Sequence, residues 1–184
     1  MFDAVADNLT AIAAELGLAD ARVYVPTGDD VRLFVPQRET DDLPDADALD
    51  TAFVVGEGPR GLALTPTGHR LFEEFERARS GPPADRPVAL ARQLADAAIE
   101  QFELADRADP ESGGDGQVTV GLGDPVYRPA RAFDHPVASL VGVGLARGLD
   151  TPVTVETRPS DDDRYDTLVT YSWKTEANAE AETA

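Results

Sequence analysis

The sequence predicts an α+β fold in which an antiparallel sheet carries helices packed on one side. Three observations favour this class. Apolar residues recur at helical spacing in several stretches, shorter apolar or alternating runs come in pairs, and clusters of Gly, Asp and Pro separate the members of each pair. Because tight turns join antiparallel strands, the paired runs predict hairpins rather than a parallel sheet.

The chain opens on a predicted amphipathic helix followed by a hairpin. Five apolar residues recur at helical spacing before the helix-ending Gly17, namely Phe2, Val5, Leu9, Ile12 and Leu16. Runs at 22–26 and 31–35 then flank a turn at 27–30, which predicts two paired strands. Since side chains alternate along a strand, we expect one side of this hairpin to carry Val23, Val25, Leu33 and Val35. The other side is expected to carry Arg22, Tyr24, Arg32 and Phe34.

A loop at 39–50 leads to a second predicted hairpin, whose strands lie at 52–55 and 61–64. Thr65 is the expected N-cap of the next helix, because Pro66 follows it at a first-turn position. The buried stripe of this helix is expected to consist of Leu71, Phe72 and Phe75. The Ser-Gly-Pro-Pro stretch at 80–83 ends the helix and forms the clearest internal boundary.

The second half is predicted to begin with a long helix over about 85–107, followed by a flexible turn at 110–116 and a strand at 117–122. An irregular connection at 123–133 leads to Asp134, the expected N-cap of a helix that runs to about Leu149. Strands at 152–157 and 167–173 complete the prediction. We therefore expect one domain over 1–173, with lobes at 1–80 and 84–173 as the alternative division, and a disordered acidic tail at 174–184.

The last helix contains three glycines, Gly142, Gly144 and Gly148, inside an apolar run. Their spacing differs from that of a dinucleotide-binding loop, which would need a glycine where Arg147 stands. Small residues within a helix let a neighbouring element approach closely. The glycines therefore predict tight helix packing.

Composition limits the function classes. The chain has 35 acidic residues, 16 basic residues and a net charge of −19, with Lys174 as its one lysine. This balance is typical of a protein that works in concentrated salt, and the lack of a basic cluster disfavours nucleic-acid binding. The hydrophobic fraction of 42% argues against an acidic disordered segment. No cysteine is present, which excludes disulfides and thiolate metal sites, and no apolar run is long enough to span a membrane.

The scarce aromatic, basic and histidine residues are the best candidates for a binding site. Within and just after the 123–133 connection lie Tyr127, Arg128, Arg131 and His135, which we predict to bind a ligand or a partner. His69 and Glu73 share a helical face and offer two ligands to a metal, but the sequence supplies no third, so no metal site is predicted. Asp134, His135 and Ser139 have the residue types of a hydrolytic triad, although helix capping explains Asp134 more simply.

Three segments, at 22–36, 60–76 and 133–149, resemble the soluble domain of a haloarchaeal protein family of unknown function. The resemblance extends over about Phe2 to Trp173. It implies a domain that usually follows a charged helical segment and a pair of membrane helices, neither of which is present in this chain. No catalytic residue is implied by it.

The expected function is therefore a non-enzymatic module that binds a ligand or a protein in a high-salt cytoplasm, alone or as the soluble part of a membrane-anchored protein. The alternative is a small-molecule or metal-dependent enzyme that uses His69 and His135 with nearby carboxylates. No cofactor and no catalytic residue is predicted, and the protein or small-molecule partner is left open.

Overall fold

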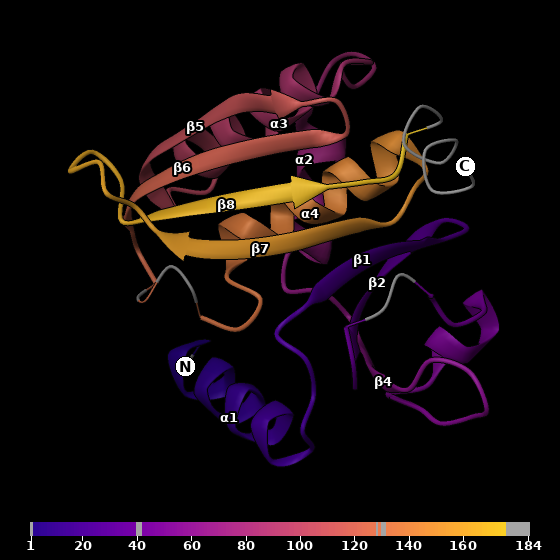
Figure 1. Cartoon of the computed structure of the whole chain (residues 1–184). Helices are drawn as coiled ribbons and strands as arrows, with labels where there is room; N and C mark the ends of the chain where they lie inside the picture. The colour runs from indigo at the N-terminus through magenta and orange to yellow at the C-terminus, as the bar shows by residue number, and fades with distance from the viewer. Residues whose placement is uncertain (1, 40–41, 128, 130–131, 176–184) are drawn as a thin grey trace.

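The computed structural model describes residues 2–39, 42–127, 129 and 132–175, and within them one antiparallel sheet of eight strands carries the fold (Figure 1). The strand order is β3-β4-β2-β1-β7-β8-β6-β5. The strands are β1 (Arg22–Thr27), β2 (Asp30–Pro36), β3 (Phe53–Val54), β4 (Gly61–Leu64), β5 (Ala105–Gly114), β6 (Gln117–Pro125), β7 (Val153–Pro159) and β8 (Thr167–Ser172). The helices are α1 (Phe2–Glu15), α2 (His69–Ala78), α3 (Pro87–Asp96) and α4 (Pro136–Leu149). Two short turns complete the elements, the 3₁₀ turn η1 (Ala46–Asp50) and the π-helical turn η2 (Ala97–Gln101).

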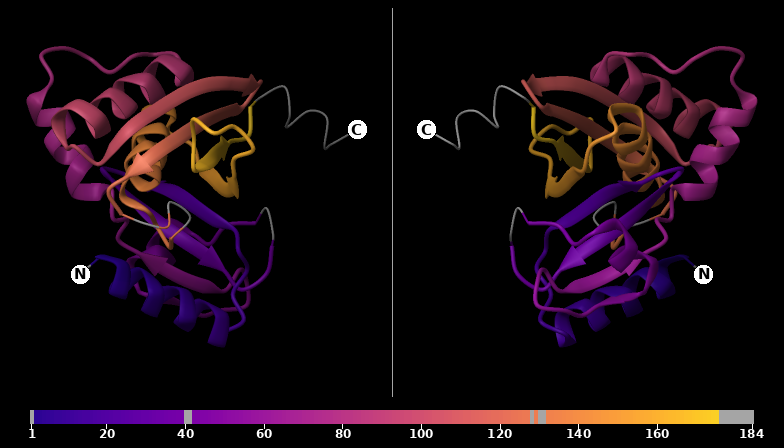
Figure 2. Two further views of the ribbon diagram at one scale, coloured as in Figure 1. Left: turned by 90° about the vertical axis from the view of Figure 1, so that its left-hand side faces the viewer. Right: turned by 90° about the vertical axis from the view of Figure 1, so that its right-hand side faces the viewer.

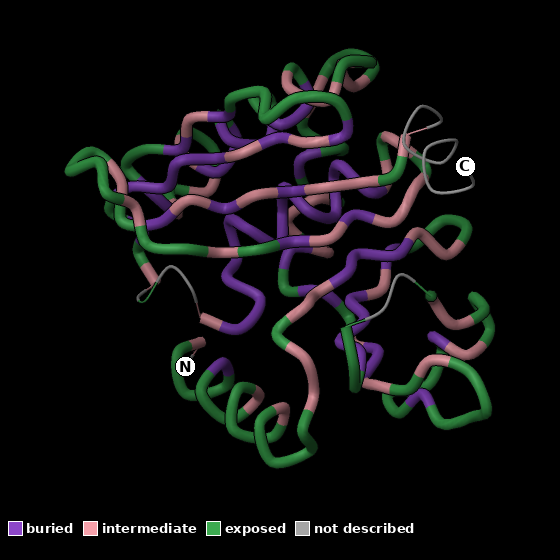
Figure 3. The backbone as a smooth tube through the Cα atoms, viewed as in Figure 1, coloured by how far each residue is buried: buried purple, intermediate pink, exposed green. Residues whose placement is uncertain are grey.

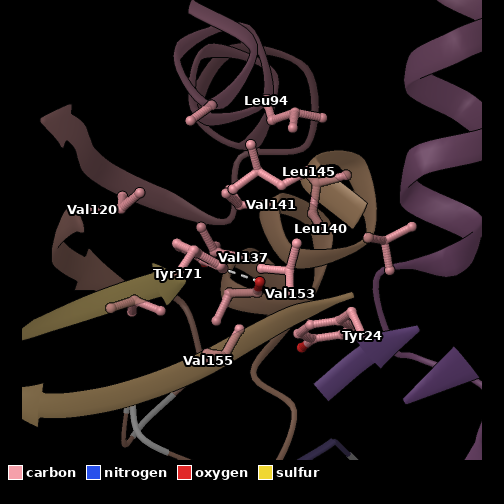
Figure 4. Close-up of a cluster of buried hydrophobic side chains, with 14 of the residues drawn as sticks. Tyr24, Leu94, Val120, Val137, Leu140, Val141, Leu145, Val153, Val155 and Tyr171 are labelled. Atoms are coloured by element: carbon pink, nitrogen blue, oxygen red, sulfur yellow. Dashed lines mark hydrogen bonds between the residues drawn. The ribbon is translucent and has the colours of Figure 1, made fainter. Parts of the chain in front are cut away.

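The helices lie on one side of the sheet, as predicted (Figure 2). The larger core forms between the sheet and the helices, where α4 packs on β1, β2 and β7, and α3 packs beside α4 on β5 and β6 (Figure 4). Residues of α1 and α2 join the same core, and α2 contacts α4. The predicted α+β class is therefore confirmed. Pairing of β1 with β7 joins the strands of the two predicted lobes into a single sheet.

The first hairpin forms as predicted, but the predicted distribution of its side chains is wrong. Val23 pairs with Phe34, and Tyr24 pairs with Leu33. Directly paired residues share a face, so Val23, Val25 and Phe34 lie on the side away from the helices. Tyr24, Leu33 and Val35 face the larger core instead. A two-residue turn at Gly28 and Asp29 sets this register, because it pairs each odd-numbered residue of one strand with an even-numbered residue of the other.

The segment between the two halves of the sequence differs most from expectation. The predicted helix over 85–107 ends much earlier, since α3 passes into η2 and Glu103 takes a left-handed φ of 52°. That reversal sends the chain into β5, which occupies most of the predicted turn at 110–116. β5 is an edge strand with few apolar residues, and only Ala105, Ala108 and Pro110 are buried along it. Polar residues and a proline are common on edge strands and weaken the strand signal there.

The side of the sheet away from the helices is covered only in part. Val23, Val25, Phe34, Val54 and Ala63 form a second, smaller core there, and η1 covers it with the fully buried Leu49. On the part of this side that β7, β8, β6 and β5 form, polar residues such as Thr119 and Thr170 are half-buried (Figure 3). The loop predicted at 39–50 is thus a cover for the first four strands.

Two helix starts also differ from prediction. α2 begins at His69 with Gly68 as its N-cap, so Thr65 does not cap it, and only Phe75 of its predicted stripe is buried. α4 is capped by His135 rather than by Asp134. Lys174 and Thr175 of the predicted tail lie within the described residues, whereas 176–184 lie outside them. In the described ranges no helix combines the length and the apolar character that crossing a membrane requires.

The glycines of α4 pack as predicted. A Cβ atom at Gly142 would collide with the ring of Tyr24, and one at Gly144 or Gly148 would collide with the side chains of Leu94 or Leu90. These positions let β1 approach one side of α4 and α3 approach another. The eleven residues from Pro136 to Ala146 are all buried as a result.

Candidate functional site

His135 is buried at the start of α4, with 1% of its surface exposed. Its Nε2 atom lies 3.0 Å from the carbonyl oxygen of Tyr127, and its Nδ1 atom lies 3.3 Å from the backbone nitrogen of Val137. A carbonyl only accepts and a backbone N–H only donates, so Nε2 carries the proton and Nδ1 accepts. His135 therefore ties the chain at Tyr127 to the first turn of α4.

Burial lowers the pKa of His135 below its ordinary value, against the opposing effects of the Tyr127 carbonyl, Asp134 and Asp3. The ring is held neutral, which its two hydrogen bonds require. This predicted binding residue thus has both nitrogens engaged by backbone groups and serves the local fold.

Tyr127 lies at the surface beside α1. Its ring centroid is 4.9 Å from that of Phe2, and Phe2 also meets the ring of His135 edge-on at 6.2 Å. The adjoining Val126 is 62% exposed. Arg128 and Arg131, the other two predicted binding residues, lie outside the described residues. Of the predicted set, the structure places Tyr127 and His135 together and joins them to the N-terminus of α1.

Asp134 has a structural role that the sequence did not suggest. Its φ of 49° is left-handed, and its carboxylate accepts hydrogen bonds from the hydroxyl of Tyr24 at 2.7 Å and from the backbone N–H of Thr67. Burial, and then the nearby Asp134, raise the pKa of Tyr24 well above its ordinary value, so its hydroxyl stays a donor. Asp134 therefore fastens β1 and the start of α2 to α4.

Ser139 completes the same attachment. Its hydroxyl oxygen accepts a hydrogen bond of 2.8 Å from the backbone N–H of Gly68. A side chain at Gly68 would collide with the backbone of Ser139 and Leu140, so only glycine fits here. The residue types of a triad are thus gathered in one place, but Ser139 and His135 bond to different backbone groups. This geometry gives Ser139 no general base.

His69 lies between two carboxylates, and each of them is close to a different nitrogen of its ring. Its Nδ1 atom lies 3.0 Å from Asp30, and its Nε2 atom lies 3.6 Å from Glu73. The two ring nitrogens point away from each other, so these carboxylates do not converge on a common ion. Among the described residues, no group of three His, Cys, Asp or Glu side chains is arranged to hold a metal. His69 and Glu73 lie close together, as their spacing predicts.

The most unusual surface belongs to α1. Phe2, Leu9 and Ala13 turn toward the larger core, and Ala6 is buried. A second apolar row stays exposed on the same helix, with Val5 at 52%, Ile12 at 45% and Leu16 at 45%. The Phe2–Tyr127 contact brings α1 next to Val126. We call Val5, Ile12, Leu16, Val126 and Tyr127 together the α1 surface.

Sequence analysis predicted α1 as an amphipathic helix but missed the α1 surface. The signal was present in the spacing, since Val5, Ile12 and Leu16 widen the apolar stripe beyond what one contact row needs. All of the charged residues of α1 are acidic, namely Asp3, Asp7 and Glu15. The helix that carries the exposed apolar row is therefore negatively charged.

Comparison with known proteins gives a family but no activity. No curated protein matches the chain, and no solved structure matches it. The family model described as Domain of unknown function (DUF7982) matches residues 1–173, which include every element of the fold described above. The chain therefore belongs to the DUF7982 family.

Proposed function

We propose that this domain is a non-enzymatic protein-interaction module that binds an amphipathic helix of its partner through the α1 surface. One observation carries the proposal, the exposed apolar row of Val5, Ile12 and Leu16 on a chain of net charge −19. Single exposed apolar residues are ordinary, but a row at helical spacing on a strongly charged protein is typical of an interaction site. The spacing matches the way helices pack against each other in pairs.

The charge of α1 indicates the chemistry of the partner. α1 carries Asp3, Asp7 and Glu15 and no basic residue. A second copy of α1 would bring two negatively charged helices together, which is unfavourable. A partner helix with an apolar centre and flanking Arg or Lys residues complements both features. Arg128 and Arg131, which the sequence analysis predicts as binding residues, follow Tyr127 in the chain.

The working environment is part of the proposal. The acidic excess and the single lysine support a cytoplasm of high salt, as in the haloarchaeal proteins that the sequence resembles, with the domain free or tethered to a membrane. Self-repulsion among the carboxylates is screened over about 3 Å in 1 M salt and over about 10 Å in 0.1 M salt. We therefore expect the melting temperature to rise strongly between low and molar KCl. A flat response would contradict the high-salt assignment.

The interaction itself is tested by capture from a high-salt lysate. The bait is the wild-type chain, and the test variant is Ile12→Glu combined with Leu16→Glu. The matched control is Val55→Glu, because Val55 is 82% exposed and follows the edge strand β3 rather than belonging to α1. We expect one partner to be recovered by wild type and control and lost by the double variant, with crosslinks from the partner to α1. Equal recovery by all three baits would refute the assignment of the α1 surface.

The predicted arginines are tested in the same assay. Arg128→Ala with Arg131→Ala is expected to weaken capture if the partner reaches past Tyr127. Unchanged capture would contradict the assignment of Arg128 and Arg131 to the binding site. Light scattering of the purified chain distinguishes self-association from binding of a different protein. A dimer that Ile12→Glu with Leu16→Glu abolishes would show that the α1 surface binds a second copy of this chain instead.

A further inference from the structure

A pocket of about 330 Å³ opens on the side of the sheet away from the helices, where β1, β7 and β8 meet. Val23 pairs with Thr154, and Thr154 pairs with Ser172, so these three residues form a row across the three strands on one face. All three line the pocket. Leu43, Pro152 and Trp173 complete its apolar lining, and Lys174 lies at its margin beyond the end of β8. We call this cavity the Trp173 pocket.

The Trp173 pocket differs from the rest of the surface in charge. The chain has one lysine and 35 acidic residues, yet the residues lining this cavity include that lysine and, in the described part of the chain, no Asp or Glu. Two other hollows of the surface are lined in part by carboxylates, including Asp20 and Glu156 in one and Asp109 and Glu111 in the other. On a chain so rich in carboxylates, a cavity lined without them is suited to an anion.

Its other lining groups set the shape of a ligand. Val23, Leu43 and Pro152 provide apolar contact for the body of a ligand, and Trp173, which also packs against the larger core, lines the pocket beside them. The ammonium of Lys174 has three N–H donors, so it can donate to a ligand in addition to a protein group. Ser172 accepts a hydrogen bond from Gln117 at 3.3 Å and keeps its own hydroxyl proton to donate. Pockets that bind small molecules commonly combine a mostly apolar lining with a few polar groups of this kind.

We propose that the Trp173 pocket binds a small carboxylate with a flat or branched apolar body, its carboxylate at Lys174 and its body against Val23, Leu43 and Pro152. A volume at the low end of the range for ligand sites limits the ligand to about the size of one ring with a short substituent. The pocket lies on the other side of the sheet from the α1 surface, so this binding is independent of the proposed protein interaction.

Fluorescence provides a direct test, because Trp173 is the one tryptophan of the chain. The probes are benzoate, benzyl alcohol and acetate, titrated at constant KCl. Benzoate carries both the ring and the carboxylate, benzyl alcohol lacks the charge, and acetate lacks the ring. We expect saturable change with benzoate and about tenfold weaker binding of the other two. A response to benzoate that never saturates, or equal affinity for benzoate and benzyl alcohol, would overturn the proposal.

Two variants separate the parts of the site. Lys174→Gln is expected to weaken benzoate by about tenfold without changing benzyl alcohol, since Lys174 is exposed after the last strand and its loss spares the core. Leu43→Ala is expected to weaken benzoate and benzyl alcohol alike. The control is Arg86→Gln, an exposed basic residue at the start of α3, which should leave every affinity unchanged. Unchanged benzoate binding by Lys174→Gln would overturn the position of the carboxylate.

Discussion

α1 and α4 have the same length, 14 residues each, and opposite places in the molecule. α4 is buried without interruption from Pro136 to Ala146, whereas Ala6 is the one buried residue of α1. Three glycines let the sheet and α3 close on α4 from different sides. α1 meets the body along one row only and leaves Val5, Ile12 and Leu16 exposed. The comparison shows that small residues, as much as apolar ones, decide which helix becomes central.

The largest expected difference between the helices is in the free energy of unfolding. Leu140→Ala in α4 should destabilise the fold by about 2–5 kcal/mol, because Leu140 is fully buried and its loss opens a cavity. Ile12→Ala in α1 should change stability by about 0.5 kcal/mol or less, since nearly half of Ile12 is exposed. Urea unfolding at fixed molar KCl measures both. Similar losses would mean that α1 is packed as tightly as α4.

Gly142→Ala tests the close approach on α4. Alanine normally stabilises a helix by about 0.5–1 kcal/mol relative to glycine. Here the added methyl group meets the ring of Tyr24, which its hydrogen bond to Asp134 holds in place. We expect a loss of about 1–3 kcal/mol instead. Gly56→Ala is the control, because no atom lies near its added methyl group. A gain in stability at Gly142 would refute the tight packing.

A double-mutant cycle tests the attachment at the start of α4. Tyr24→Phe and Asp134→Ala each remove one end of the buried hydrogen bond, and we expect a coupling energy of about 1–3 kcal/mol. Tyr165 and Asp109 form a similar bond of 2.8 Å near the surface, so Tyr165→Phe with Asp109→Ala is the matched cycle. The coupling energy between Tyr165 and Asp109 should be clearly smaller than that between Tyr24 and Asp134, because water can hydrogen-bond to the group that loses its partner. Equal couplings would show that burial adds nothing to this bond.

The smallest expected effect is a pH dependence where the two helices meet. The pKa of His135 is lowered in the folded chain, so the unfolded chain binds a proton first as the pH falls below about 6.5. The free energy of unfolding therefore falls as the pH drops from about 6.5 to the lowered pKa of folded His135. The total loss is about 1.4 kcal/mol for each unit by which folding lowers this pKa. His135→Asn keeps a good N-cap and should remove this part of the slope.

The pH measurement compares wild type, His135→Asn and His69→Gln by urea unfolding. The His69 variant controls for the other histidine, and Asp134 and Asp3, which face His135, are unchanged in all three chains. Identical slopes for wild type and His135→Asn would contradict the burial of a neutral ring at this junction.

Much of the fold could be predicted from local patterns. α1, both hairpins of the first half, β6, β7, β8 and α4 each have a hydrophobic period or a turn signal within their own residues, and the glycines of α4 indicated close packing. β5 could not be found this way, because its polar sequence forms a strand only when β6 supplies hydrogen-bond partners. The faces of the first hairpin were misassigned because the register, not the apolar content, decides them.

The candidate sites depended even more on distant residues. Tyr127 and His135 were singled out from the sequence for their rarity, but the contact of Phe2 with both rings joins chain segments more than 120 residues apart. Asp134 was expected to cap its own helix, yet its carboxylate binds Tyr24 and Thr67. The side chains that satisfy a buried carboxylate come from elsewhere in the chain, so local spacing does not reveal them.

By itself, the sequence determined the fold class, most element positions and the acidic character, because these depend on local periodicity and composition. The tertiary structure alone decided that His135 is a neutral buried cap and that α1 keeps an exposed apolar row. It alone gathered Val23, Thr154 and Trp173 around one pocket. Burial and hydrogen bonding depend on which distant segments pack together, and no local pattern in the chain specifies that.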